Sequence, residues 1–455
     1  IPQITAPADS GWSVGTIADY LGVPTGVPNL SVSALPFRAY ALVMNEWFRD
    51  ENLSDPLVVP VDDATVAGVN TGTFVTDVAK GGLPYKAAKY HDYFTSCLPS
   101  PQKGPDVLIP SATSGEYPVV TREQPHDPGG YVLTGVSNIS FASGDRPVNI
   151  YDSLAFKPVV SGSNYAGITG FSGGGDKPGF DPVNLYAVSS NGLGASINQL
   201  RMAFQIQKLY EKDARGGSRY IEILKSHFGV TSPDARLQRP EYLGGNRVPI
   251  NINQVVQQSA TASGETAQGT VTGMSVTTDT HSDFTKSFTE HGFVIGVMVA
   301  RYDHTYQQGL ERFWSRKDRF DYYWPVFANI GEQAVKNKEI YAQGPGVKDN
   351  AGAVIDDQVF GYQEAWADYR YKPSRVTGEM RSQYAQSLDV WHLADDYSAL
   401  PMLSDSWIRE DKTNVDRVLA VTSSVSNQLF ADIYIKNRTT RPMPMYSIPG
   451  LIDHH

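Results

Sequence analysis

Several short patterns in this sequence contain residue types that carry out catalysis in other proteins. Gly170, Ser172 and Gly174 fit the G-x-S-x-G pattern, in which a nucleophilic serine follows a buried strand and begins a helix. The stretch after this serine is rich in glycine and contains a proline, so it cannot form that helix. Lys177 lies close by, but Pro178 follows it where a phosphate-binding loop needs serine or threonine. The pattern therefore predicts neither a serine nucleophile nor a phosphate loop.

The acidic doublets and the histidines form no recognisable catalytic or metal-binding arrangement. Three doublets begin at Asp62, Asp356 and Asp395, each where a turn is expected, and aspartate is common in turns because it bonds the local backbone. The nine histidines lack the regular spacings of zinc ligands. His91 beside Asp92 could bind a cation with residues distant in sequence, but a hydrogen-bonded structural pair is the simpler interpretation. The sequence predicts no catalytic residue, no metal site and no cofactor.

The stretch 301–327 is the richest in aromatic and charged residues, with nine aromatic, five basic and four acidic side chains. Basic residues interleaved with aromatics can stack on the bases of a single strand. Here the acids nearly cancel the positive charge, which a groove facing phosphates would not favour. Aromatic and arginine enrichment with compensating carboxylates is typical of subunit interfaces, and an ordinary core with a solvated loop is the alternative. The candidate interface residues are Arg312, Phe313, Trp314, Arg319, Tyr322, Tyr323 and Trp324.

The C-terminal stretch 433–452 contains no acidic residue, although the whole chain has a net charge of −10. Its basic groups lie among tyrosines and prolines, so it is the best candidate for touching a DNA backbone. An extended arm lying across a neighbouring subunit explains the stretch equally well. The candidate DNA-contact residues are Lys436, Arg438, Arg441 and Tyr446.

Composition limits the remaining function classes. A net charge of −10 argues against a surface that binds nucleic acid everywhere, so any such contact is local. No apolar run is long enough to span a membrane, and we expect no membrane insertion. Cys97 is the single cysteine, which excludes an intrachain disulfide, and we interpret it as a small buried apolar residue. The 41 glycines, 29 prolines and 25 tyrosines indicate a loop-rich β architecture.

The elements that would position these residues are mostly strands. Strand-like runs occur at 247–256, 292–302, 364–372, 415–422 and 429–436, and their spacing suggests a sandwich or jelly roll. The run 292–302 is continuously apolar, as expected of a strand covered on both faces.

Three helices are marked by their end signals. One has Pro36 in its first turn, a second begins with a capping box from Ser196 and stops at Gly216, and a third ends at Gly229. The last two could suggest a helix-turn-helix that reads duplex DNA. The final helix has an apolar face with little basic charge, so packing explains it better.

Two stretches have the composition of loops. Residues 105–190 lack a helical period and are rich in glycine, proline, serine and aspartate. A structureless loop of that length is implausible in a compact domain, which predicts an inserted subdomain or packed surface excursion. Residues 259–273 are small and polar and predict a mobile loop.

Longer blocks resemble a known family. The blocks PFRAYALVMNEWFRDENL (36–53), KYHDYFTSCLPSPQKG (89–104), SRYIEILKSHFGVTSPDARLQRPEYLGG (218–245) and RFDYYWPVFANIGEQAV (319–335) resemble the major capsid proteins of gokushoviruses, a branch of the Microviridae. IADYLGVPTGV near the start and the IPGLIDHH ending fit the same pattern. The matches follow the family order from about residue 17 to the C-terminus.

The resemblance implies a mainly β fold, a viral jelly-roll barrel with large loop insertions and a few short helices, as one domain over 1–455. It implies a homo-oligomeric icosahedral shell around a circular single-stranded DNA genome, formed in the host bacterial cytoplasm. Residues 105–190 would be the variable insertion that projects near the threefold axes and serves host attachment. Family members also carry an N-terminal segment ahead of the point where this chain begins, so we expect a longer natural chain.

The resemblance also implies partners: a small basic DNA-binding virion protein, a minor pilot protein and a host surface receptor. The rival from another class is a carbohydrate-active β-sandwich enzyme, which the tyrosine, tryptophan and aspartate content would suit. Electron microscopy separates the two, because an enzyme has no reason to form uniform shells.

Overall fold

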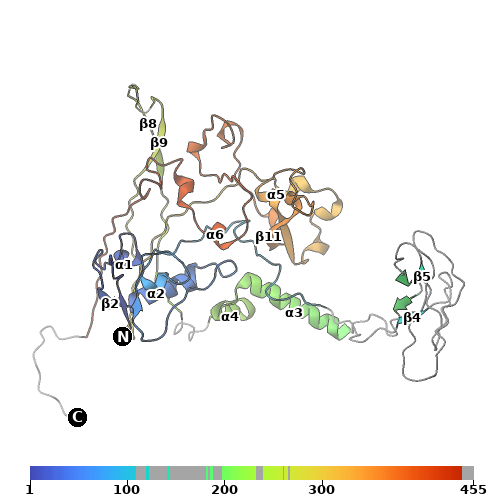
Figure 1. Cartoon of the computed structure of the whole chain (residues 1–455), viewed down its shortest axis with the longest axis horizontal. Helices are drawn as coiled ribbons and strands as arrows, with labels where there is room; N and C mark the ends of the chain where they lie inside the picture. The colour runs from blue at the N-terminus through green and yellow to red at the C-terminus, as the bar shows by residue number, and fades with distance from the viewer. Residues whose placement is uncertain are drawn as a thin grey trace, which may run out of the picture. The chain divides into compact units, whose positions relative to one another are not determined.

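The computed structural model describes residues 1–108, 119–121, 141–142, 181–182, 185–187, 197–231, 239–259, 261–264 and 267–442. Internal contacts divide the chain into two compact units. Unit 1 comprises residues 1–103 and 211–455, and unit 2 comprises residues 104–210. Most of the described chain is neither helix nor strand, and its sheets are small (Figure 1).

The helices are short except for one. They are α1 (Ile17–Tyr20), α2 (Leu35–Val43), α3 (Ile197–Gly216), α4 (Tyr220–Phe228), α5 (Asn337–Ile340) and α6 (Asp405–Ile408). The strands are β1 (Gln3–Thr5), β2 (Ser31–Ser33), β3 (Val66–Ala67), β4 (Val119–Thr121), β5 (Phe141–Ala142), β6 (Asp181–Pro182), β7 (Leu185–Ala187), β8 (Ile252–Val256), β9 (Val271–Ser275), β10 (Glu332–Lys336) and β11 (Val359–Glu364).

The first core of unit 1 is built around α2. Pro36 occupies the first turn of this helix, as predicted, where its missing N–H costs no hydrogen bond. A turn of π-helix, Met44–Phe48, extends α2. Trp12 is fully buried and stacks on Phe37 of α2, with ring centroids 5.8 Å apart. The sheet β2-β1-β3 packs against this helix through Ile4, so the N-terminal part has its own apolar core.

The second core of unit 1 surrounds the antiparallel pair β10–β11. Val335 of β10 and Phe360 of β11 pack with Phe94 and Cys97 from a distant loop. Cys97 is buried and its Sγ–H donates to the carbonyl of Tyr93 at 3.3 Å, while burial raises the pKa of the thiol. This agrees with the prediction of a small buried residue, because a thiol with a raised pKa is a poor nucleophile.

The predicted helix ends are largely confirmed. Helix α3 ends at Gly216, and α4 ends before Gly229, which adopts the left-handed conformation with φ of 69°. Glycine takes this conformation without steric cost, which is why it terminates helices. Ser196, the predicted cap of α3, lies outside the described residues. The apolar residues of α3 are largely exposed, including Phe204 at 58%.

The strand predictions are only partly correct. β8 occupies the second half of the run 247–256 and pairs with β9, and most of the predicted 259–273 loop joins them. The runs 292–302, 415–422 and 429–436 contain no strand. The run 364–372 is also wrong, because β11 ends at Glu364 and a 3-10 turn, η8 (Ala367–Tyr369), follows. These runs have the side chains of a strand, but a strand also needs a hydrogen-bonding neighbour, which local sequence does not specify.

The described strands of unit 2 form two nested antiparallel pairs. β4 pairs with β7 and β5 pairs with β6, so in the sequence the pair β5–β6 lies between the two strands of the pair β4–β7. The proposed insertion 105–190 falls within this unit. Gly170, Ser172 and Lys177, considered above for catalysis, lie outside the described residues.

The fold class is therefore confirmed at a coarse level. The described chain is mostly non-helical, with small sheets and few helices. Among the described residues the sheets contain two or three strands each and do not close into a barrel. No helix in the described ranges is both long and apolar enough to cross a lipid bilayer.

Candidate assembly surface

The aromatic stretch that the sequence singled out folds as three short 3-10 turns: η4 (Arg312–Ser315), η5 (Arg319–Asp321) and η6 (Pro325–Phe327). Asp318 caps η5 by accepting a hydrogen bond from the backbone N–H of Phe320 at 2.7 Å. Pro325 begins η6. Turns as short as these have almost no interior of their own. Their large side chains therefore either pack against other segments or remain exposed.

The candidate aromatic residues are exposed in the single chain. Trp314 is 65% exposed and Trp324 50% exposed. The exposed apolar members are Phe313, Trp314, Phe320, Tyr322, Tyr323, Trp324 and Val326, and we call them the aromatic surface. Aromatic side chains gathered on a surface mark interaction sites, because leaving them in water forfeits their burial energy.

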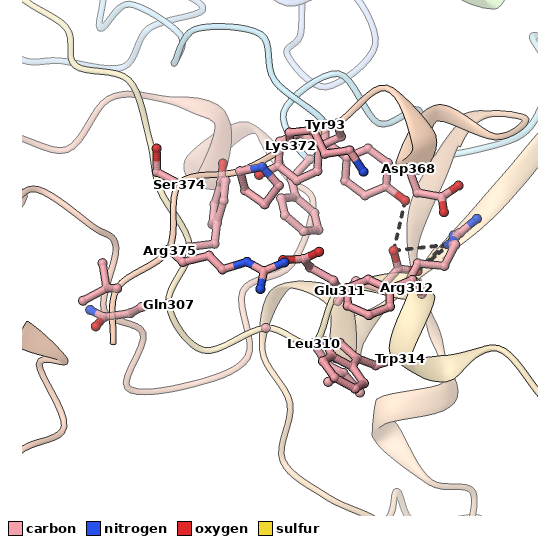
Figure 2. A pocket seen from close by; sticks show the side chains of 18 of the residues that line it. Tyr93, Gln307, Leu310, Glu311, Arg312, Trp314, Asp368, Lys372, Ser374 and Arg375 are labelled. Carbon is pink, nitrogen blue, oxygen red and sulfur yellow. Dashed lines mark hydrogen bonds and ion pairs between the residues drawn. The ribbon is translucent and has the colours of Figure 1, made fainter. Parts of the chain in front are cut away.

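The arginines of the stretch have different surroundings. Arg319 is exposed, and its guanidinium lies 4.9 Å from the ring centre of Phe320. Arg312 points inward and donates to Glu339 at 2.9 Å, while Glu339 also accepts from the Tyr93 hydroxyl at 2.9 Å (Figure 2). Burial alone would lower the pKa of Arg312, but the charge and hydrogen bond of Glu339, together with the charges of Tyr93 and Asp368, outweigh burial and raise that pKa. Arg312 therefore ties η4 to α5.

A buried network that sequence analysis missed centres on His304 and Asp395. The Nδ1 of His304 lies 2.9 Å from Oδ1 of Asp395, and its Nε2 lies 3.2 Å from Glu410. The side chains of His304 and Asp395 are 0% and 2% exposed. Asp395 also accepts hydrogen bonds from the hydroxyls of Tyr302 at 3.0 Å and Tyr397 at 2.9 Å. The doublet at Asp395 predicts a turn, and no spacing in the sequence indicates these partners.

The charges of this network stabilise one another. Burial alone would lower the pKa of His304, but hydrogen bonds to Asp395 and Glu410 raise it to about 9. Burial would raise the pKa of Asp395, but the hydrogen bond and charge of His304, together with Lys89 and Tyr397, outweigh burial and lower it. Lys89 lies 4.0 Å from Asp395, and burial lowers the pKa of this lysine. The network is a structural charge cluster, and no group of metal-binding side chains occurs among the described residues.

The predicted pair of His91 with Asp92 is not part of this network. Asp92 caps its own turn by accepting hydrogen bonds from the backbone N–H groups of Phe94 and Thr95, each at 2.8 Å. It also accepts from the Tyr306 hydroxyl at 2.7 Å. Asp92 therefore has a structural role, but the expected hydrogen bond between His91 and Asp92 is not formed.

The candidate DNA-contact residues lie on a separate extended segment. Lys436, Arg438 and Arg441 are exposed and outside any helix or strand, and none forms an ion pair within the described part of the chain. Tyr446, the fourth candidate, lies outside the described residues. No hydrogen bond or ion pair joins the described part of this segment to the aromatic surface.

A pocket of about 410 Å³ lies beside η4 (Figure 2). One side carries Phe313 and Trp314, and another is formed by the segment from Lys372 to Thr377. Arg316 and Asp368 also line it. This pocket was not predicted, because its walls come from parts of the chain far apart in sequence.

Comparisons with known proteins agree with this architecture. The profile of the phage family described as capsid protein (F protein) matches residues 1–451. Capsid protein VP1 of Spiroplasma virus 4 is 44% identical over 456 residues, covering 99% of this chain and 79% of the relative. Capsid protein VP1 of Chlamydia phage 1 is 42% identical over 486 residues, covering 99% of this chain and 80% of the relative. Capsid protein VP1 of Bdellovibrio phage phiMH2K is 42% identical over 465 residues, covering 99% of this chain and 78% of the relative.

These matches extend over nearly the whole chain, and they confirm the resemblance carried by the four sequence blocks. The chain belongs to the phage capsid protein (F protein) family.

Proposed function

We propose that this chain is the major structural subunit of a small icosahedral phage and that many copies close into one shell. The observation that carries this proposal is the 42–44% identity to capsid proteins VP1 over 99% of the chain. In this proposal the subunit completes a jelly-roll barrel and is assembled in the host bacterial cytoplasm. The relatives are named as capsid proteins, which favours a structural role over a carbohydrate-active enzyme.

The aromatic surface is proposed as a subunit interface. Its exposed rings would be buried by a neighbouring copy, and symmetry would repeat that contact throughout the shell. The ion pair of Arg312 with Glu339 ties η4 to α5, so the rings of η4 are presented on a braced backbone. Interfaces with such bracing lose little conformational freedom on association.

Trp324→Ala is expected to impair shell formation more than subunit folding. Loss of one central aromatic contact costs about 2 kcal/mol or more per interface, and every copy carries the same defect. Particle yield by electron microscopy and unfolding of the unassembled subunit are measured in parallel. Trp391→Ala is the matched control, because Trp391 is 51% exposed, Trp324 is 50% exposed, and only Trp324 belongs to the aromatic surface. Equal losses of folding and assembly for Trp324→Ala would indicate an ordinary core residue.

The basic tail is proposed to contact the single-stranded DNA genome. Its three charged side chains are exposed on an extended segment, so they can follow a flexible phosphate chain. A small basic virion protein, a minor pilot protein and a host receptor are proposed as further partners because the family resemblance implies them.

Replacing Lys436, Arg438 and Arg441 together by Gln is expected to leave shells intact and weaken genome retention. The slope of log binding constant against log salt concentration should fall in magnitude by about 2 when three contacts to the phosphates of a single strand are lost. Binding of two oligodeoxynucleotides of unrelated sequence is measured across a salt series, and both should respond alike. A triple variant that packages DNA normally yet fails to close shells would place the tail on a neighbouring subunit instead.

The insertion 105–190 is proposed to serve host attachment. The proposal rests on the family resemblance and on the placement of these residues within unit 2. Adsorption of particles that lack residues 131–175 is the measurement that tests it.

A further inference from the structure

Helix α3 carries two exposed cations that have no partner among the described residues. Arg201 and Lys208 form neither an ion pair nor a side-chain hydrogen bond there. Arg215 on the same helix differs, because it pairs with Glu332 and donates to the carbonyl of Ser96 at 3.0 Å. The charges of Arg201 and Lys208 therefore serve no contact within the described part of the subunit.

Four exposed side chains share one side of α3, at positions i, i+3, i+4 and i+7. They are Arg201, Phe204, Gln205 and Lys208, and we call them the α3 face. The ring of Phe204 is 58% exposed. Ile206 lies on the opposite side of the helix and is less exposed than any of the four. The α3 face is therefore the outward side of the helix, with one ring between two cations.

The α3 face contains no acidic residue. The sequence from Pro182 to Tyr210 has neither aspartate nor glutamate, and the first acid that follows is Glu211. A solvated helix face usually mixes both signs, because opposite charges three or four positions apart stabilise a helix. In a chain with a net charge of −10, this stretch is locally basic. Such a local charge favours an anionic partner.

A single strand of nucleic acid fits this set of side chains. Arginine, lysine and glutamine bind phosphate and sugar oxygens, and an exposed ring stacks on an unpaired base of any kind. Arg201 and Lys208 are roughly 10 Å apart along the helix axis, so they can meet different phosphates of one strand. The stretch 301–327 lacks this property, because its acids nearly cancel its basic charge.

We propose that the α3 face binds single-stranded DNA, with Phe204 stacked on a base and with Arg201 and Lys208 on phosphates. The proposal rests on the proposed function, in which the shell encloses a single-stranded genome. It adds a contact that is separate in sequence from the basic tail and that holds a base as well as phosphates.

The first test removes the two charges. Binding of an oligodeoxynucleotide to the unassembled full chain is measured across a salt series. In the double variant Arg201→Gln, Lys208→Gln, the slope of log binding constant against log salt concentration should fall in magnitude by about 1.4, the share of two phosphates. The double variant Lys86→Gln, Lys348→Gln is the matched control, because it loses the same charge at two exposed positions outside α3. Its slope should be unchanged.

The second test removes the ring. Phe204→Leu keeps an apolar side chain and favours the helix but cannot stack on a base. Its affinity for the oligodeoxynucleotide should fall at least about fivefold, the loss of one stacked base. Phe204→Tyr keeps a ring and should bind as the unaltered chain does. Phe288→Leu is the control, because Phe288 is 56% exposed and lies outside α3. Circular dichroism checks that each variant retains its helices.

The outcomes distinguish this proposal from the proposed function. An unchanged slope in the α3 double variant and unchanged affinity in Phe204→Leu, in a chain that still binds single-stranded DNA, overturn the α3 contact alone. A chain that binds no single-stranded DNA at any salt concentration overturns genome enclosure as well. Loss of shells in Phe204→Leu with unchanged oligodeoxynucleotide binding would show that the α3 face contacts a neighbouring subunit, which also overturns the proposal.

Discussion

Replacing Asp395 with alanine is expected to destabilise the subunit by about 3–5 kcal/mol, the cost of breaking a buried ion pair from one side. Asp395 is 2% exposed at its side chain and accepts from His304, Tyr302 and Tyr397. Its loss leaves the charge of His304 buried beside Glu410 alone and leaves two hydroxyls without their acceptor. The change is measured as the midpoint of denaturant unfolding of the unassembled subunit.

The adjacent residue supplies a matched control. Asp396 has the same chemistry and is exposed, with one hydrogen bond from Gln383 at 2.6 Å. Asp396→Ala should change the unfolding free energy by about 0.5 kcal/mol or less, as for most surface positions. Similar losses for the two alanine variants would show that burial of Asp395 is not what makes it important.

The stability of the subunit is expected to fall as the pH rises from about 6.5 to 9. The pKa of His304 is about 9 in the folded chain, above the value of about 6.5 for a free histidine. A group whose pKa is raised by folding stabilises the folded chain fully at pH values below its unfolded pKa. That stabilisation is lost as the pH rises through the folded pKa. A shift of this size corresponds to at most about 3 kcal/mol. Lys89 opposes the trend, because burial lowers the pKa of this lysine.

The acid side of the profile has the opposite sign. The pKa of Asp395 is lowered in the folded chain. Asp395 therefore stabilises the folded subunit above about pH 4, and this stabilisation is lost as the pH falls through the folded pKa. Unfolding is measured at pH 6 and pH 9 for the unaltered chain, His304→Gln and His291→Gln. The pH 6 to 9 difference should shrink in His304→Gln and persist in the variant of the exposed His291. A difference that survives in His304→Gln would assign the titration to another group.

Sequence patterns predicted local structure well where the cause is local. Pro36 lies in the first turn of α2, and Gly216 and Gly229 mark the ends of α3 and α4, because capping and backbone conformation depend on neighbours a few residues away. The prediction of a strand at 292–302 was wrong because strand formation also depends on a hydrogen-bonding partner that is distant in sequence. Its apolar side chains favour a strand, yet Met298 is 71% exposed and the run pairs with no strand among the described residues.

The sequence by itself determined family membership, the coarse fold class and the aromatic character of the candidate interface, since each depends on residue identity and order. Only the tertiary structure decided which charges meet. His304 and Asp395 are 91 positions apart, and His304 and Glu410 are 106 apart, so no spacing rule could join them. It also turned Arg312 inward toward Glu339 and left Arg319 exposed, because the direction of a side chain follows from the path of the whole backbone.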